Sequence, residues 1–220
     1  MNHILRNKAA IFDMDGLLID SEPFWYQSEI SVLSEMGVDT SKINPNEVLG
    51  LRINQVVELY YQQSPWKGAT INDVVDKIVD RTMEKIIEHR PLLPGVLEAL
   101  EMARSLDMKI GLASASPHRL LNMVVELFDF TQYFDCISSA EYLPYSKPHP
   151  EVYLMTAEKL GVSPLQSVAF EDSLHGMIAT KAARMRSVVV PNKEIKDDPR
   201  WVLADIKLDS LTELRKDDIL

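Results

Sequence analysis

Two aspartates stand two residues apart near the amino terminus. The apolar residues 9–12 end abruptly in Asp13-Met14-Asp15-Gly16, a pattern typical of a buried parallel strand that delivers acidic groups at its carboxyl end. Carboxylates held this close repel each other unless a cation or a shared proton offsets the repulsion. Mg²⁺ prefers hard oxygen ligands and often shares its coordination sphere with a substrate phosphate. The pair therefore indicates magnesium and phosphate chemistry, although acidic pairs also occur in ordinary turns.

Polar groups of complementary kinds follow later apolar runs. Ser114 follows one such run, Lys147 precedes a proline, and Glu171 and Asp172 follow another run. Because the carboxyl ends of parallel strands meet at one edge of a sheet, we expect these side chains to converge on the first aspartate pair. A hydroxyl and an ammonium can each hold a phosphoryl oxygen, while a second acidic group completes a metal site.

Each of these residues also has a purely structural explanation. Ser114 can cap the helix expected near Pro117, Lys147 can be a solvated loop lysine, and Glu171 with Asp172 can cap a following helix. Their joint placement at the ends of predicted strands favours a phosphoryl-transfer site.

The elements that position these residues alternate between strand and helix. Predicted strands cover residues 9–12, 109–113, 136–138, 167–170 and 187–190. Predicted helices with one apolar face cover residues 96–105, 118–127, 150–160 and 174–184. This alternation predicts an α/β fold with a doubly wound, Rossmann-like parallel sheet.

Between residues 22 and 89 the alternation disappears. Segments 24–36, 53–63 and 71–89 read as helices without intervening strands. We therefore expect an α/β core formed by residues 1–21 and 90–220 and an inserted helical cap formed by residues 22–89. Because the insertion leaves just after the first acidic strand end, it should cover the carboxyl edge of the sheet, where ligands of open α/β folds bind.

Composition narrows the classes of partner. The chain has 220 residues, 46% of them hydrophobic, and a formal net charge of -10, which disfavours nucleic acid because its binders neutralise phosphates with Lys and Arg. The single cysteine, Cys136, cannot form an internal disulfide, so a reducing compartment is expected. The amino-terminal residues show neither a signal-peptide core nor a spanning helix. We expect a cytoplasmic monomer that binds neither nucleic acid nor a membrane.

Four segments then carry a family resemblance. They are Phe12-Asp13-Met14-Asp15-Gly16, Ala113-Ser114-Ala115-Ser116, Ser146-Lys147-Pro148-His149-Pro150 and Phe170-Glu171-Asp172-Ser173. With these motifs in this order over residues 9–190, the chain resembles the haloacid dehalogenase superfamily of phosphohydrolases. The helical insertion is similar to the cap of the beta-phosphoglucomutase-like branch. Within that branch, residues 17–23 and 142–150 look most like the bacterial hexitol phosphatases, also described as 2-deoxyglucose-6-phosphate phosphatases.

The resemblance implies roles for the acidic residues. Asp13 would be the nucleophile that becomes an aspartyl-phosphate, and Asp15 the general acid and base. Asp13 must be ionised to attack phosphorus, whereas Asp15 must first hold a proton for the departing alkoxide. One Mg²⁺ would be held by the carboxylates of Asp13 and Asp172 and by the main-chain carbonyl of Asp15. Glu171 would support the metal site or Lys147.

The resemblance also implies substrate contacts. Ser114, Ala115 and Lys147 would bind the phosphoryl group. Arg52 matches a cap arginine that reaches into the site in the mutase-like branch, although a surface arginine at a helix start explains it equally well. The expected activity is hydrolysis of small sugar or sugar-alcohol phosphates, such as hexitol phosphates and 2-deoxyglucose 6-phosphate.

Alternative functions share parts of this chemistry. A sugar-phosphate mutase of the beta-phosphoglucomutase type uses the same aspartyl-phosphate, and the core motifs do not separate it from a phosphatase. The segment Pro23-Phe24-Trp25, which stands where the mutase-like cap carries additional polar residues, favours hydrolysis. A signalling receiver also accepts phosphate on an aspartate, but it needs no lid. Trp25 and Tyr26 fit either a sugar contact or packing within the cap, and the sequence leaves this open.

Overall fold

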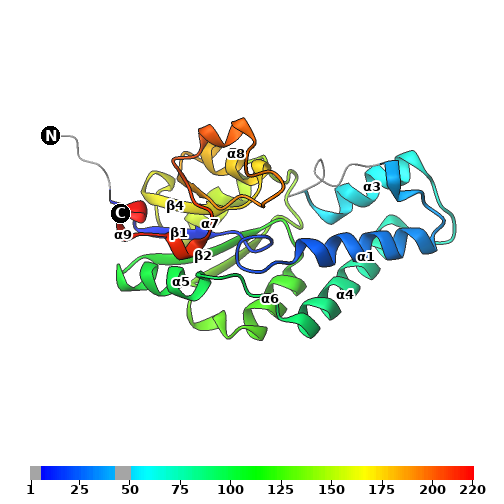
Figure 1. Cartoon of the computed structure of the whole chain (residues 1–220), viewed down its shortest axis with the longest axis horizontal. Helices are drawn as coiled ribbons and strands as arrows, with labels where there is room; N and C mark the ends of the chain where they lie inside the picture. Colours follow the sequence, from blue (N-terminus) through cyan, green and yellow to red (C-terminus); the bar gives the residue numbers. More distant parts are fainter. Residues whose placement is uncertain (1–5, 43–50) are drawn as a thin grey trace.

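A six-stranded parallel sheet forms the centre of the molecule. The computed structural model describes residues 6–42 and 51–220, so residues 1–5 of the predicted core and 43–50 of the predicted cap lie outside the described residues. The strand order is β3-β2-β1-β4-β5-β6, and every neighbouring pair is parallel (Figure 1). The strands are β1 (Ala9–Phe12), β2 (Lys109–Ser114), β3 (Cys136–Ser139), β4 (Ser167–Glu171), β5 (Arg186–Val189) and β6 (Ile206–Lys207). The predicted doubly wound α/β fold is confirmed.

Helices cover both faces of this sheet. Figure 1 shows α7 and α8 on one face and α5 and α6 on the other. Their bounds are α5 (Val96–Ser105), α6 (His118–Leu127), α7 (Glu151–Leu160) and α8 (Leu174–Ala182), and α9 (Lys216–Ile219) closes the chain. Short 3₁₀ turns occur at Thr40–Lys42, Phe130–Gln132, Pro164–Gln166, Pro199–Leu203 and Leu211–Glu213. None of the helices formed by the described residues is long and apolar enough to cross a membrane.

Strand β1 is buried on both faces, which explains why it reads as a continuous apolar run. Ala9 and Ile11 pack into a cluster with residues of α7 and α8. Ala10 and Phe12 belong to the larger cluster on the opposite face, where the ring of Phe12 stacks on that of Phe170 at 4.4 Å. This alternation fixes the register of the central strand and hence the direction in which the following aspartates emerge.

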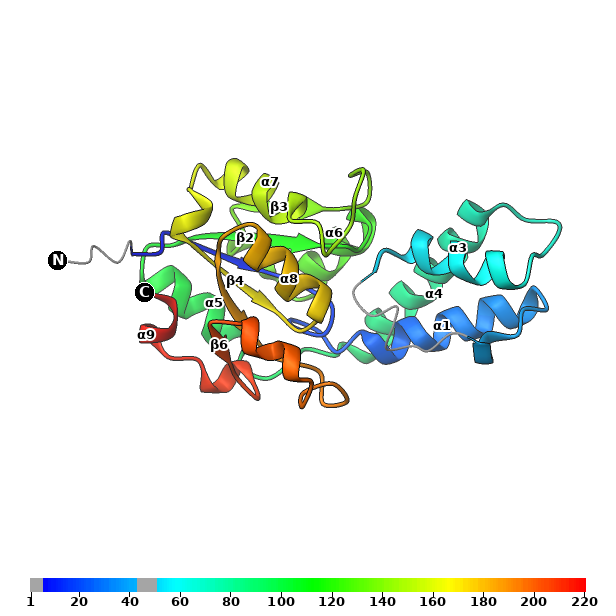
Figure 2. The ribbon, with the colours of Figure 1, turned by 90° about the horizontal axis from the view of Figure 1, so that it is seen from above.

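The inserted segment contains α1 (Glu22–Glu35), α3 (Ile53–Gln63) and α4 (Ile71–His89), and no strand occurs in its described part. These helices pack together beyond the carboxyl edge of the sheet (Figure 2). Helix α1 begins directly after Ser21, and α4 ends at Arg90, which has a left-handed backbone conformation. The helical character of the insertion is confirmed, and its bounds lie within two residues of the expected segments.

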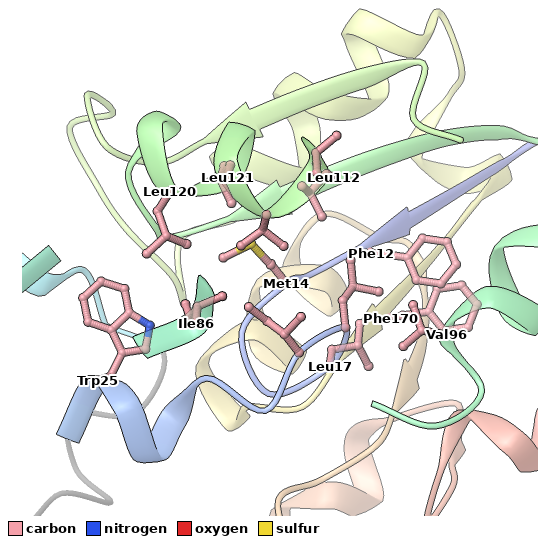
Figure 3. Packing of buried hydrophobic residues seen from close by; sticks show 14 of the residues in the cluster. Phe12, Met14, Leu17, Trp25, Ile86, Val96, Leu112, Leu120, Leu121 and Phe170 are labelled. Atoms are coloured by element: carbon pink, nitrogen blue, oxygen red, sulfur yellow. The ribbon is translucent and has the colours of Figure 1, made fainter. Parts of the chain in front are cut away.

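A continuous apolar cluster joins the insertion to the sheet. Met14 and Leu17, in the loop after β1, pack with Trp25 of α1, Ile86 of α4 and Leu120 of α6 (Figure 3). All are buried. The loop that carries the first acidic motif is therefore held between the sheet and the insertion.

Candidate active site

The carboxyl edge of the sheet gathers the predicted chemical groups around β1. Asp13 follows the last residue of β1, and its Oδ1 lies 2.8 Å from Nζ of Lys147. Since β1 pairs with β2 on one side and β4 on the other, Ser114 and Glu171 end the two flanking strands. Asp13, Ser114, Lys147 and Glu171 are all buried. The structure thus brings together side chains separated by more than a hundred residues in the sequence.

Lys147 lies between two carboxylates. Its Nζ is 2.8 Å from Asp13 Oδ1 and 2.6 Å from Glu171 Oε1, and only 2% of its side chain is exposed. Burial disfavours the ammonium, but the charges of Asp13 and Glu171 outweigh this effect and raise the pKa of Lys147 above its ordinary value. The lysine therefore supplies a permanent positive charge at the base of the site.

Negative charge nevertheless exceeds positive charge here. Oxygen atoms of Asp13, Glu171 and Asp172 lie within 4.8 Å of one another. Among the described residues, Lys147 is the only basic group in ion-pair contact with this cluster, through Asp13 and Glu171. Burial, assisted by the nearby carboxylates and opposed by Lys147, raises the pKa of Asp13 to about 7. Burial and the charges of Glu171 and Asp13 raise the pKa of Asp172 well above its ordinary value.

Asp172 has the features of a ligand to a divalent cation. Its Oδ2 is buried without a hydrogen-bond partner among the described residues. Gly16, with φ +74°, passes so close that a Cβ there would lie 2.0 Å from this oxygen. Glycine at this turn therefore leaves room for the carboxylate. A hard cation beside Asp13 and Asp172 would offset the excess charge and satisfy the orphaned oxygen, so the residues fit a bound metal ion.

Glu171 is already occupied by protein donors. Its Oε1 accepts from Lys147 and from the hydroxyl of Tyr153 at 2.5 Å, and its Oε2 accepts from the main-chain N–H groups of Asp172 and Ser173. A Cβ at position 176 would lie 1.8 Å from the carboxylate, so Gly176 allows helix α8 to start against it. This geometry suits a residue that orients Lys147 more than one that coordinates a metal.

Asp15 receives hydrogen bonds from both the core and the insertion. Its Oδ1 accepts from Ser21 Oγ at 2.6 Å and from Trp25 Nε1 at 2.9 Å. Its Oδ2 accepts from Ser116 Oγ at 2.6 Å and lies 3.4 Å from Ser114 Oγ. The sequence left open whether Trp25 contacts a sugar or packs within the cap. In the structure Trp25 is buried, and it also donates a hydrogen bond to Asp15, a predicted catalytic residue.

A cavity of about 440 Å³ opens above these residues, a volume suited to a small ligand. Its core side includes Asp13, Asp15, Ser114, Ala115, Ser116, Lys147 and Asp172, and its other walls include Glu22, Trp25, Tyr26, Glu29, Leu51, Ile53, Asn192, Glu194 and Ile195. Ser21 and Ser116 contact Asp15 and lie within the segments of the family resemblance, but neither was predicted as a site residue. Glu29 and the loop at residues 192–195 line the cavity and were not predicted either.

Arg52 is placed differently from the other predicted contacts. It precedes α3, and its guanidinium donates to the main-chain carbonyls of Ala140 at 2.9 Å and Leu143 at 2.7 Å. It is not among the residues that line the cavity. In this structure Arg52 joins the insertion to the loop after β3, and its predicted contact with substrate stays a prediction.

Comparisons with known proteins identify the family of the chain. Residues 10–190 match the sequence model of the haloacid dehalogenase-like hydrolases. The chain is 55% identical over 213 residues to hexitol phosphatase B of Escherichia coli (strain K12), with 96% of each chain covered. It is 30% identical over 183 residues to the phosphorylated carbohydrates phosphatase of Thermotoga maritima, covering 82% of this chain and 83% of that relative. The structure is similar to beta-phosphoglucomutase from Clostridium difficile, with TM-score 0.83, 26% identity, and coverage of 95% and 93%.

Proposed function

This chain belongs to the haloacid dehalogenase-like hydrolases, and from that premise we propose that it is a Mg²⁺-dependent phosphatase of small sugar and sugar-alcohol monophosphates. Hexitol phosphates and 2-deoxyglucose 6-phosphate are the expected substrates. One observation carries the proposal: the carboxylate of Asp13 is buried at a cavity base, paired with Lys147 and adjacent to the unpaired oxygen of Asp172. Identity of 55% with hexitol phosphatase B supports the substrate class.

The proposed reaction has two steps, and Asp13 and Asp15 act in both. A carboxylate oxygen of Asp13 attacks phosphorus, the ester P–O bond breaks, and Asp15 gives its proton to the departing alkoxide. Asp15 then takes a proton from a water molecule that attacks the aspartyl-phosphate, which releases phosphate and restores Asp13. Lys147 and Ser114, with Ala115 beside them, bind the oxygens of the transferred group.

The metal would be held by the carboxylates of Asp13 and Asp172 and by the main-chain carbonyl of Asp15. When bound, Mg²⁺ supplies positive charge that offsets the repulsion between the nucleophile and the phosphate. Glu171 fixes the position of Lys147 through the contact at 2.6 Å. The clustered carboxylates of Asp13 and Asp172 support two of these ligands, and the carbonyl of Asp15 is carried over from the family's motif.

We propose further that residues 22–89 act as a cap domain over a core formed by residues 1–21 and 90–220. Ser21, at the end of the first core segment, and Trp25, in the first cap helix, both donate hydrogen bonds to Asp15. Movement of the cap would therefore move a donor to the proposed acid, which supports this division. Closure would exclude bulk water and place the acid at the leaving group. We also propose that the protein is a cytoplasmic monomer. Its single cysteine, which cannot form an internal disulfide, supports the reducing compartment.

The deciding experiment is phosphate release from p-nitrophenyl phosphate with and without Mg²⁺, followed by a substrate panel. The panel contains mannitol 1-phosphate, sorbitol 6-phosphate, 2-deoxyglucose 6-phosphate, glucose 6-phosphate, beta-glucose 1-phosphate, a nucleotide and a phosphopeptide. We expect Mg²⁺-dependent release, highest for hexitol and deoxyhexose phosphates. Dominant conversion of beta-glucose 1-phosphate to its 6-phosphate, read by NMR, would select the mutase alternative instead, and preference for the nucleotide would reject the sugar assignment.

A further inference from the structure

Helix α1 presents a line of residues to the cavity opposite the catalytic groups. Glu22, Tyr26 and Glu29 lie four and three residues apart, so they share one face of the helix, and all three line the cavity. Glu29 stands two turns, about 10 Å, beyond Glu22 along the helix axis. This face of α1 thus extends from the catalytic end of the cavity toward its far end.

Glu29 is an unusual residue for this position. It is only 9% exposed, and its carboxylate makes no hydrogen bond or ion pair with another described residue. Burial raises its pKa to about 7. Since Glu29 lines the cavity and no described residue donates to it, its carboxyl oxygens are available for hydrogen bonds with water or with a ligand that occupies the cavity.

Acidic side chains outnumber basic ones along the whole cavity wall. Lys147 is the only basic side chain among the described residues that line it. Three basic groups of the insertion have other partners: Arg52 donates to main-chain carbonyls, Arg81 pairs with Glu35, and Lys85 donates to Gln27. Beyond the phosphate-binding end, therefore, the wall offers Glu22 and Glu29 without a compensating cation.

This arrangement suits one kind of substrate tail. A carboxylate accepts hydrogen bonds from hydroxyl groups, and the apolar walls formed by Trp25, Leu51, Ile53 and Ile195 can pack against carbon chains. A second phosphate at the same place would find no basic partner among the described residues and would lie beside Glu22 and Glu29. Burial raises the pKa of these two groups to about 8 and about 7, so the phosphate meets negative charge whenever they ionise.

We infer that Glu29, with Glu22 beside it, is the specificity-determining acidic wall of the cap: it binds the hydroxyl groups of an uncharged polyol tail and excludes substrates with a second phosphate. The inference rests on the proposed phosphatase function and extends it to the far end of the substrate. It also bears on the choice between hydrolysis and mutase chemistry, since transfer to a second hydroxyl proceeds through a sugar bisphosphate. A wall that repels the second phosphate disfavours that route.

Glu29→Gln tests the inference, because it keeps the shape and removes the charge. For this variant, KM for a hexitol monophosphate should rise about tenfold, and inhibition by a hexitol bisphosphate should become at least fivefold stronger. Turnover of p-nitrophenyl phosphate, whose tail has no hydroxyl groups, should stay within about twofold of wild type. Glu29→Asp retains the charge but shortens the reach, so it should raise KM for the monophosphate while still excluding the bisphosphate.

Glu35→Gln is the matched control, because Glu35 lies on the same helix but pairs with Arg81 at the surface. It should change none of the three readouts. An unchanged KM and unchanged bisphosphate inhibition in Glu29→Gln would overturn the inference, provided that the variant still hydrolyses p-nitrophenyl phosphate and so is folded. Absence of hydrolysis in the wild-type protein with Mg²⁺ would instead reject the proposed function.

Discussion

At the scale of single residues, the placement of Asp13 and Asp15 separates their roles. Asp13 contacts Lys147 and lies in the buried acidic cluster, whereas Asp15 accepts hydrogen bonds from hydroxyl and indole groups. Two carboxylates two residues apart thus have different surroundings. Such a difference is what allows one to act as an ionised nucleophile and the other as a proton carrier.

Asp13→Asn should fold but lose turnover, to below about a tenth of the wild-type rate, because the covalent route is removed. Asp15→Asn should be nearly inactive on sugar phosphates but still form some phosphoenzyme with p-nitrophenyl phosphate, whose leaving group needs no proton. Rapid-quench detection of phosphoenzyme separates the two. Appearance of phosphoenzyme in Asp13→Asn would show that the nucleophile is another residue.

Removal of the metal should affect stability as well as rate. Without a cation, three carboxylates cluster and only Lys147, among the described residues, forms ion pairs with them, through Asp13 and Glu171. Mg²⁺ should therefore bind the folded state and raise the melting temperature in proportion to the logarithm of its concentration. Chelation should abolish hydrolysis. Asp172→Asn, which weakens the proposed site, should lose most of the Mg²⁺-induced thermal shift; a full shift in this variant would contradict the metal assignment.

At the scale of elements, helix α1 links the insertion to the acid. Trp25 donates its indole N–H to Asp15 at 2.9 Å, so Trp25→Phe keeps most of the buried ring and removes this donor. We expect kcat for a hexitol phosphate to fall about tenfold and kcat for p-nitrophenyl phosphate to change much less. Trp66→Phe is the matched control, because Trp66 is also buried in the insertion but its indole N–H has no hydrogen-bond partner among the described residues. Equal losses on both substrates would indicate a general disturbance of the site.

The same helix should make stability depend on pH. Burial raises the pKa of Glu29 to about 7 from 4.5, so the folded protein binds a proton that the unfolded chain has released between these values. This contribution to stability is present at low pH and is lost as pH rises toward 7, by roughly 3 kcal/mol at most. In urea denaturation, Glu29→Gln should therefore gain stability over wild type at pH 8 but not at pH 4.5. An equal difference at both pH values would contradict a raised pKa.

At the scale of the whole molecule, the sequence predicts those features that depend on a local residue pattern, and it does not predict those that depend on tertiary packing. The buried strand before Asp13 and the helices of the insertion follow from apolar patterns, and the parallel sheet then places Ser114 and Glu171 beside β1. Strand β6 has only two residues and carries no such pattern. Glu29 could not be selected, because its burial depends on how the insertion sits over the sheet.

The position of the insertion itself gives the last prediction. Arg119 of α6 pairs with Asp76 at 3.1 Å and with Asp80, both on α4, and Arg52 binds the loop after β3. Exposed ion pairs contribute about 0–1 kcal/mol each, so Arg119→Gln should shift the balance between closed and open forms without unfolding the protein. Solution scattering should show a larger radius of gyration for this variant, and binding of a metal-fluoride phosphate mimic should reduce the radius in both proteins. A free protein that is open, and that keeps the same radius with the mimic bound, would exclude a lid role for residues 22–89.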